Sequence, residues 1–288
     1  MHNAILNQLS PDYPWKDQFF WFSSLGSTND HLRQLAAQGA PHGTVILASH
    51  QTNGHGRMGR SFQSPEGMGV YLSILLRPMC APTELMHLTC AAAAAMCDAV
   101  EQAAGFRPGI KWTNDLVLGK RKLGGILTEL RLSPRGNVEY AIIGIGINCR
   151  QTEADFVPEI RDMAASVSMI TGRQMEISKM AAAMMEALAR MDHMLLTDKA
   201  GILERYRRDC VTLGQDISLI RGEEIRHGKA LDLDADGGLI VAFTDGSAEV
   251  VSSGEVSIRE CTDIFRPFFQ KFKKSYCIFL KDWLYLSI

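Results

Sequence analysis

The sequence lacks the features that mark several large classes of proteins. Its seven cysteines include no CxxC pair, so neither a disulfide framework nor a zinc site is predicted. No uncharged apolar stretch reaches the length of about 18 residues that suggests a membrane-spanning helix. The first residues, MHNAILNQLSPDYPWKD, have neither the basic start nor the long apolar run of a signal peptide. These absences predict a cytoplasmic protein with free thiols.

Two common nucleotide-binding signatures are missing as well. The chain has no GKS or GKT, so a P-loop is not predicted, and no GxGxxG stands between a strand and a helix, as a Rossmann fingerprint would require. The net charge of -2 argues neither for nor against a polyanionic partner. DLDADG, residues 232–237, begins like a calcium-binding EF-hand loop, but Phe243 stands where the bidentate glutamate belongs. A hairpin turn is predicted there instead.

What the chain does have is a mixture of strand and helix patterns up to about residue 210. Residues 19–25 read as a strand, followed by a helix that Ser27 or Thr28 caps and that ends near Gly39. A second helix is expected from Thr83 to Ala104, with Gly105 ending it. Further strands are expected at residues 43–50, 69–78, 109–119, 121–130 and 140–149. The last of these is apolar on both faces, which predicts a central position in a sheet.

Two further patterns concern the later part of the chain. From residue 177, apolar residues recur at helical spacing and predict a stripe that faces the core: Ile177, Met180, Met184, Leu188 and Met191. After Cys210, short strands alternate with glycine-rich turns, as in a small SH3-like barrel. The predicted organisation is a catalytic or binding domain at 1–210, an SH3-like domain at 211–261 and an aromatic-rich tail at 262–288. The tail could bind a surface, pack as an extra helix or be unrelated to the rest.

The connection QTNGHGRMGRSFQSPEGMG, residues 51–69, is too long and too rich in glycine for a simple turn. Its glycines let backbone N–H groups converge on an anion, and Arg57 and Arg60 can bind phosphate or carboxylate oxygens. A basic surface turn is the alternative. The segment GIGIN at 144–148 places glycines on a strand that looks buried, which permits close approach of a ligand or a neighbouring backbone.

A second polar cluster lies on the hairpin that begins with KWTND. Lys111, Asn114, Asp115 and Lys122 combine two cations, an amide and a carboxylate beside Trp112 and apolar neighbours. An exposed hairpin carries such residues for solubility alone. If the hairpin is packed, its charges need partners, which a nucleotide with its metal ion would supply.

Five motifs together resemble the biotin protein ligases, also called biotin–[acetyl-CoA-carboxylase] ligases. They occur in order over about residues 18–260: STN at 27–29, QTNGHGRMGRSF at 51–62, KWTNDL at 111–116, RKLGGIL at 121–127 and GIGIN at 144–148. The resemblance implies an α+β fold, with a mixed sheet like that of class II aminoacyl-tRNA synthetases, helices on one side of it, and a small C-terminal SH3-like β-barrel. It also implies ATP and Mg²⁺ as cofactors and biotin as the substrate.

The implied reaction joins biotin to ATP as biotinyl-5′-AMP and then transfers biotin to a lysine of a carrier protein. Carried over by motif, the catalytic residues are Arg57, Lys122 and Asp115. The implied biotin-binding residues are Ser27, Thr28, Asn29, Gln51, Gly54, His55, Gly56, Arg57, Lys122, Gly144 and Gly146. The implied adenylate-binding residues are Arg57, Arg60, Phe62, Lys111, Asn114 and Asn148. Mg²⁺ would be held through the ATP phosphates, with Asp115 as a candidate protein ligand.

One position departs from the family pattern, which usually has arginine where this chain has His55. An imidazole cannot replace the guanidinium fork, so we expect altered affinity for biotin or the adenylate. Some relatives carry an N-terminal winged helix that binds DNA. Only 26 residues precede the STN motif here, so sequence-specific DNA binding is not expected.

The implied partner is the biotin carboxyl carrier domain of acetyl-CoA carboxylase and similar enzymes, and the protein would be a monomer or a homodimer. Two rival functions remain open. A lipoate or octanoate ligase shares the fold, but the RRxxGGGxVxH-like motif of that family has no match here. A non-catalytic biotin-binding protein would use the same pocket without consuming ATP.

Overall fold

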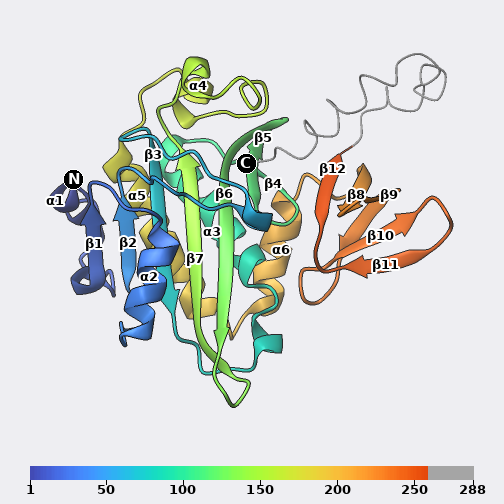
Figure 1. Ribbon diagram of the computed structural model, residues 1–288, viewed down its shortest axis with the longest axis horizontal. Coiled ribbons are helices and arrows are strands. Elements are labelled where there is room, and N and C mark those ends of the chain that lie inside the picture. Colours follow the sequence, from blue (N-terminus) through green and yellow to red (C-terminus); the bar gives the residue numbers. More distant parts are fainter. Residues whose placement is uncertain (259–288) are drawn as a thin grey trace. The chain divides into compact units, whose positions relative to one another are not determined.

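The computed structural model describes residues 1–258, which form two compact units (Figure 1). The first extends from Met1 to Asp209, and the second begins at Cys210. The aromatic-rich tail that the sequence suggested at 262–288 lies outside the described residues.

A seven-stranded mixed sheet forms the frame of the first unit. Its order is β1-β2-β3-β7-β6-β5-β4; β1 and β2 are parallel, and every other neighbouring pair is antiparallel. The strands are β1 (Phe19–Phe22), β2 (Val45–Ala48), β3 (Gly69–Leu76), β4 (Gly109–Lys111), β5 (Asp115–Leu118), β6 (Arg121–Leu132) and β7 (Val138–Asn148). The doubly apolar β7 is the middle strand, as predicted. The strand expected at 109–119 is divided into β4 and β5 by a turn at residues 112–114.

The helices of this unit are α1 (His2–Leu6), α2 (Thr28–Ala37), α3 (Leu88–Ala104), α4 (Val167–Thr171), α5 (Ile177–Met194) and α6 (Lys199–Asp209). The predicted cap of α2 is confirmed, because the Ser27 hydroxyl accepts from Asp30 N at 3.4 Å. Helix α3 begins later than expected, after a 3-10 turn at Pro82–Leu85, and Gly105 ends it with φ 79°. The stripe predicted on α5 is buried.

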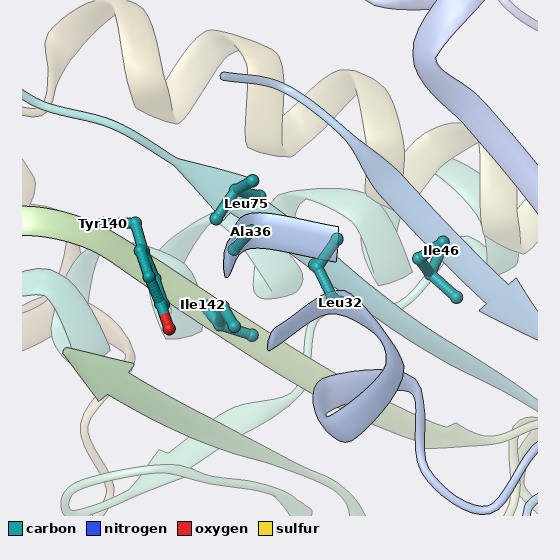
Figure 2. Packing of buried hydrophobic residues seen from close by; sticks show 6 residues of the cluster. All are labelled: Leu32, Ala36, Ile46, Leu75, Tyr140 and Ile142. Atoms are coloured by element: carbon teal, nitrogen blue, oxygen red, sulfur yellow. The ribbon is translucent and has the colours of Figure 1, made fainter. Parts of the chain in front are cut away.

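Helix α2 is fixed to the sheet by an apolar cluster, shown in Figure 2. Leu32 and Ala36 of the helix pack against side chains from β2, β3 and β7: Ile46, Leu75, Tyr140 and Ile142. Four of these six side chains are completely shielded from solvent. Burial of this kind stabilises the fold by roughly 1.5–3 kcal/mol for each large side chain, so the helix start is held firmly over the sheet.

Helices cover both faces of the sheet, which corrects the expectation of helices on one side only. Ser73 of β3 donates to Thr28 and Asn29 of α2, whereas Thr128 of β6 bonds to Thr89 of α3. Ser73 and Leu127 both pair with Gly144, so Thr128, one residue along, points to the opposite face. Short apolar helix patterns do not reveal which face of a sheet they cover. We call the side that carries α2 the α2 face.

The second unit contains one five-stranded antiparallel sheet in the order β11-β10-β9-β8-β12. Its strands are β8 (Asp216–Arg221), β9 (Glu224–Leu233), β10 (Leu239–Phe243), β11 (Ala248–Val251) and β12 (Glu255–Ile258). The edge strands β11 and β12 do not pair within residues 210–258, so the predicted barrel is not closed there. The predicted hairpin is present, because the Asp234 carboxylate accepts from Asp236 N and Gly238 N in the turn from β9 to β10.

Among residues 1–258, no helix combines the length and the apolar character needed to cross a bilayer.

Candidate active site

The start of α2 joins the glycine-rich loop through a row of side-chain hydrogen bonds. Gln51 Oε1 accepts from the backbone N and the hydroxyl of Thr28 at 2.9 and 3.0 Å. At the other end of the same amide, Gln51 Nε2 donates to the Ser64 hydroxyl at 2.9 Å. The predicted residues Thr28 and Gln51 are therefore together, and Ser27 beside them is buried as the helix cap.

Asn29 lies against the glycine strand β7. A side chain at Gly144 would collide with the Asn29 amide, which explains why a strand otherwise rich in isoleucine has glycine here. The amide also contacts two residues outside the motifs: Nδ2 donates to Glu129 Oε2 at 2.8 Å, and Oδ1 accepts from the Ser73 hydroxyl. Asn29 is 4% exposed, so its orientation is set by these bonds.

The second glycine of β7 makes room for the loop. Any side chain at Gly146 would overlap the Phe62 ring, which is almost fully buried and packs edge-to-face on Tyr71. Gly54 is needed for a similar reason, because a Cβ there would lie 2.6 Å from the Phe62 carbonyl oxygen. The loop therefore lies directly on β7, with little of the Phe62 ring open to solvent.

A short 3-10 turn, Arg57–Gly59, presents the arginine of the loop. Arg57 Nη1 donates to Asn114 Oδ1 at 2.9 Å, and Asn114 Nδ2 donates to the Ile126 carbonyl at 2.9 Å. The loop and the KWTND hairpin, 57 residues apart in sequence, are thus joined at this contact. Two residues predicted to contact the adenylate are brought together here.

His55 connects the loop to α2. Its Nε2 lies 2.8 Å from Asp30 Oδ2, and Arg33 reaches the other oxygen of the same carboxylate at 2.8 Å. Partial burial acts to raise the pKa of Asp30, but hydrogen bonds from His55 and Arg33 outweigh it and hold that pKa below its ordinary value. The residue that departs from the family pattern is therefore used as a contact within the chain.

Lys122 and Asp115 form the most enclosed ion pair of the site, with Nζ to Oδ1 at 2.8 Å and each side chain about one seventh exposed. Burial lowers the pKa of Lys122, and the charges of Lys111 and Arg60 add to that effect while Asp115 opposes it. Lys111 and Arg60 are therefore close enough to contribute to one positive field. Asp115 pairs across the sheet with Gly125, and Gly125 pairs with Gly146, so the ion pair lies in the row that passes under Phe62.

Asn148 makes hydrogen bonds within the chain, and the adenylate contact expected of it stays a prediction. Its amide donates to the Ala165 carbonyl at 3.1 Å and accepts from Gln151 at 3.0 Å. In this structure the side chain ties the end of β7 to the segment before α4.

The sequence pattern did not indicate four residues of the site: Asp30, Arg33, Ser73 and Glu129. They form a continuous line with Asn29 and His55 on the α2 face. A signal for Glu129 was present, because residues 125, 127 and 129 alternate onto the face that holds the glycines of β7. Nothing local links it to α2, since the contact joins residues 100 positions apart.

The arrangement suits an elongated ligand with an anionic centre. Polar hydroxyls and amides lie near the start of α2, the glycines of β7 lie beneath Asn29 and Phe62, and Lys122 lies beside Asp115 and Gly125. Within residues 1–258, no three His, Cys, Asp or Glu side chains converge as a metal cage. One carboxylate beside several cationic side chains fits Mg²⁺ that arrives with a nucleotide, because that ion keeps water and phosphate ligands.

Comparisons with known proteins agree with the resemblance to the biotin protein ligases. Residues 21–148 match the Biotin/lipoate A/B protein ligase family, and residues 212–259 match the Biotin protein ligase C terminal domain. The Bifunctional ligase/repressor BirA of Bacillus subtilis is 34% identical over 80% of this chain and 70% of its own length. The Biotin--[acetyl-CoA-carboxylase] ligase of Paracoccus denitrificans is 31% identical over 80% of this chain and 96% of its own.

A similar solved structure is the biotin protein ligase of Aquifex aeolicus in complex with biotin and ATP. It has a TM-score of 0.70 and 28% identity, and the match covers 84% of this chain and 99% of that one. The sequence identity to the proteins of Bacillus subtilis and Paracoccus denitrificans shows a shared family, and the fold agrees with it. The chain belongs to the biotin protein ligase family and is a biotin ligase.

Proposed function

We propose that this protein activates biotin with ATP as biotinyl-5′-AMP and then transfers biotin to a lysine of a biotin carboxyl carrier domain, in the cytoplasm. The observation that carries the proposal is the enclosed pair of Lys122 and Asp115 in the row that passes beneath Phe62. The enclosed ammonium group of Lys122 and the guanidinium group of Arg57, which Asn114 holds against the hairpin, fit a negatively charged reaction centre.

In the first step, an oxygen of the biotin carboxylate attacks the α-phosphorus of ATP. The bond from that phosphorus to the bridging oxygen breaks, and pyrophosphate leaves with the electron pair. Lys122 and Arg57 would stabilise the charge that builds on the α-phosphate oxygens, because preformed cations in a partly dry site need little reorganisation. Arg60 and Lys111 would add attraction for the remaining phosphates.

In the second step, the lysine amine of the carrier attacks the carbonyl carbon of the mixed anhydride, AMP leaves, and the amine loses a proton. The polar wall of Thr28, Asn29 and Gln51 would hold biotin in both steps, since its ureido ring has one acceptor and two donors. Mg²⁺ would supply charge neutralisation on the phosphates, with Asp115 as a candidate protein ligand.

The decisive experiment is biotin-dependent exchange of labelled pyrophosphate into ATP, with lipoate and octanoate as parallel substrates. Exchange with biotin alone supports adenylation and the choice of acid together. Exchange with lipoate or octanoate would assign the chain to the rival activity of the superfamily. Folded protein that exchanges with none of the three acids in the presence of Mg²⁺ would favour a non-catalytic biotin-binding protein.

Carrier transfer needs a separate assay. Purified protein, biotin and ATP are incubated with the carrier domain of an acetyl-CoA carboxylase, and mass spectrometry detects the biotin added to it. A carrier domain whose target lysine is replaced by arginine is the matched control. If the protein supports exchange but never modifies a carrier, the proposed acceptor is wrong while the adenylation step stands.

A further inference from the structure

Glu129 is a carboxylate of β6 that the proposed chemistry does not use. Its two oxygens have different partners: Oε2 accepts from Asn29 Nδ2 at 2.8 Å, and Oε1 accepts from Arg33 Nη2 at 2.7 Å. The side chain is about one third exposed, so the ion pair with Arg33 adds little stability as a surface contact. The contact with Asn29 is a better reason for a carboxylate at this position.

A carboxylate can only accept hydrogen bonds, so the atom of Asn29 that faces it must be the NH₂ group. The oxygen of the Asn29 amide is thereby directed to the other side, toward Ser73. Gly144 leaves just enough space for this amide against the sheet, which fixes its position. Glu129 then fixes the orientation of the amide, with the NH₂ group toward the carboxylate and the oxygen away from it.

The oxygen of Asn29 is left with capacity to accept a further bond. Ser73 has one hydroxyl proton and lies within bonding distance of Asn29 Oδ1 and, at 2.7 Å, of Thr28 Oγ1. Thr28 can direct its own proton to Gln51 Oε1. Thr28 Oγ1 and Asn29 Oδ1 therefore share the one proton of Ser73, and an N–H donor of a ligand would give Asn29 Oδ1 a second hydrogen bond.

We infer that Glu129 is a positioning residue for biotin: it holds the Asn29 amide with its oxygen presented to a ureido N–H, and Arg33 keeps the carboxylate in place. This inference rests on the proposed role of Asn29 as a biotin contact. With glutamine at 129, the neutral amide could face Asn29 with either end, and Asn29 could present its NH₂ group to the ligand instead. Two donors would then oppose each other, which costs the bond and leaves polar groups unpaired.

The test is a double-mutant cycle with biotin binding measured by calorimetry. The proteins are the full chain, Glu129→Gln, Asn29→Ala and the double variant. We expect Glu129→Gln to weaken biotin binding at least about tenfold, as for a buried polar group that is left without its hydrogen bond. In the Asn29→Ala background the same change should have almost no further effect, because the residue that Glu129 positions is gone. The KM for ATP should stay unchanged in Glu129→Gln.

Glu139→Gln is the matched control, since Glu139 is an exposed carboxylate near Arg131 on the adjacent strand and contacts no site residue. It should leave the Kd for biotin as in the full chain. Thermal unfolding of each variant shows whether it folds. If Glu129→Gln does not fold, Arg33→Gln replaces it, because the half-exposed Arg33 holds the same carboxylate, and it should weaken biotin binding in the same direction.

Three results would overturn the inference. One is an unchanged Kd in the folded variant at 129, or at 33 where that variant replaces it. Another is an equal loss with and without Asn29, which would mean a structural role that does not pass through this amide. The third is an Asn29→Ala variant that binds biotin normally. Failure of the unaltered chain to bind biotin at all is a different result, because it would contradict the proposed function itself.

Discussion

Lys122 carries its charge in a place where burial opposes it, and Asp115 is what keeps the ammonium ion in the site. Removing one member of such a pair leaves the other charge without its partner, so a substitution of either residue should have a measurable effect. Both residues come from a hairpin whose polar residues are evident in the sequence, but the sequence did not show whether that hairpin is exposed or packed. The pair is the basis for two predictions at the scale of single residues.

The first prediction concerns the charge itself. Lys122→Met should reduce biotin-dependent pyrophosphate exchange by about 100-fold or more, as expected when one electrostatic contact to a reacting group is removed. Lys120→Met, which changes an exposed lysine in the turn before β6, is the control and should retain full exchange. Normal exchange by a well-folded Lys122→Met protein would mean that Lys122 takes no part in adenylation.

The second prediction concerns pH. Because the pKa of Lys122 is lowered, mainly by burial, the side chain loses its proton at a lower pH than an ordinary lysine. In the proposed reaction the ammonium form is the active one, so the exchange rate should fall as the pH rises through that lowered pKa. Lys122→Arg, which stays charged, should move the alkaline fall to higher pH if it retains activity. Superimposable profiles of the two active enzymes would contradict the assignment.

The third prediction concerns His55. The imidazole occupies the position of a family arginine and already bonds to Asp30. His55→Arg would keep that contact with a permanent charge and a wider fork, so biotin should bind several-fold more tightly, in line with roughly 0.2–1 kcal/mol for an exposed pair. Calorimetry gives the Kd directly. A Kd that is unchanged or weaker would show that the loop gains nothing from arginine here.

Among the elements, β7 decides how closely α2 and the glycine-rich loop approach the sheet. Ile143, Ile145 and Ile147 fill the core on one face, whereas Gly144 and Gly146 lie on the other face, toward α2 and the loop. Periodicity alone predicted a buried central strand. The reason for each glycine appears only with its neighbours in place: the Asn29 amide above Gly144 and the Phe62 ring above Gly146.

Gly146→Ala tests this division of the strand. The added methyl group would enter the space of the Phe62 ring, and overpacking of this kind costs about 1–3 kcal/mol. We expect a lower midpoint of thermal unfolding and weaker biotin binding, because the ring can move only by displacing the loop. Gly26→Ala serves as the control, since a Cβ at Gly26 meets no atom within 4 Å. Equal midpoints for the two variants would show that Phe62 is free to move.

At the scale of the whole chain, a ligand that bridges α2, the loop and β7 should stabilise the fold. A ligand at about 100 times its Kd adds about 2.7 kcal/mol to the free energy of unfolding if it binds only the folded state. Biotin should therefore raise the midpoint of thermal unfolding by several degrees, and lipoate at equal concentration should not. A larger shift with lipoate would count against the biotin assignment. Differential scanning calorimetry with both acids decides between them.

Short-range sequence patterns were sufficient to predict several elements of this fold. The cap at Ser27, the end of α3 at Gly105 and the hairpin at Asp234 depend on residues close together in the sequence, and the apolar run of β7 was enough to predict its central position. The expectation of helices on one side was wrong for α2, and the predicted barrel is not closed in the described residues. Both of those features depend on contacts between distant segments, which local propensity does not encode.

The glycine-arginine loop, the polar hairpin and the STN segment can be read from the order of the residues, and the family follows from them. Which of these groups meet depends on the folded chain. It joined Arg57 to Asn114, connected His55 to Asp30, tied Asn148 to the segment before α4, and placed Glu129 beside Asn29. The physical reason is that hydrogen bonds and ion pairs act over a few ångströms, while the residues that make them lie tens of positions apart along the chain.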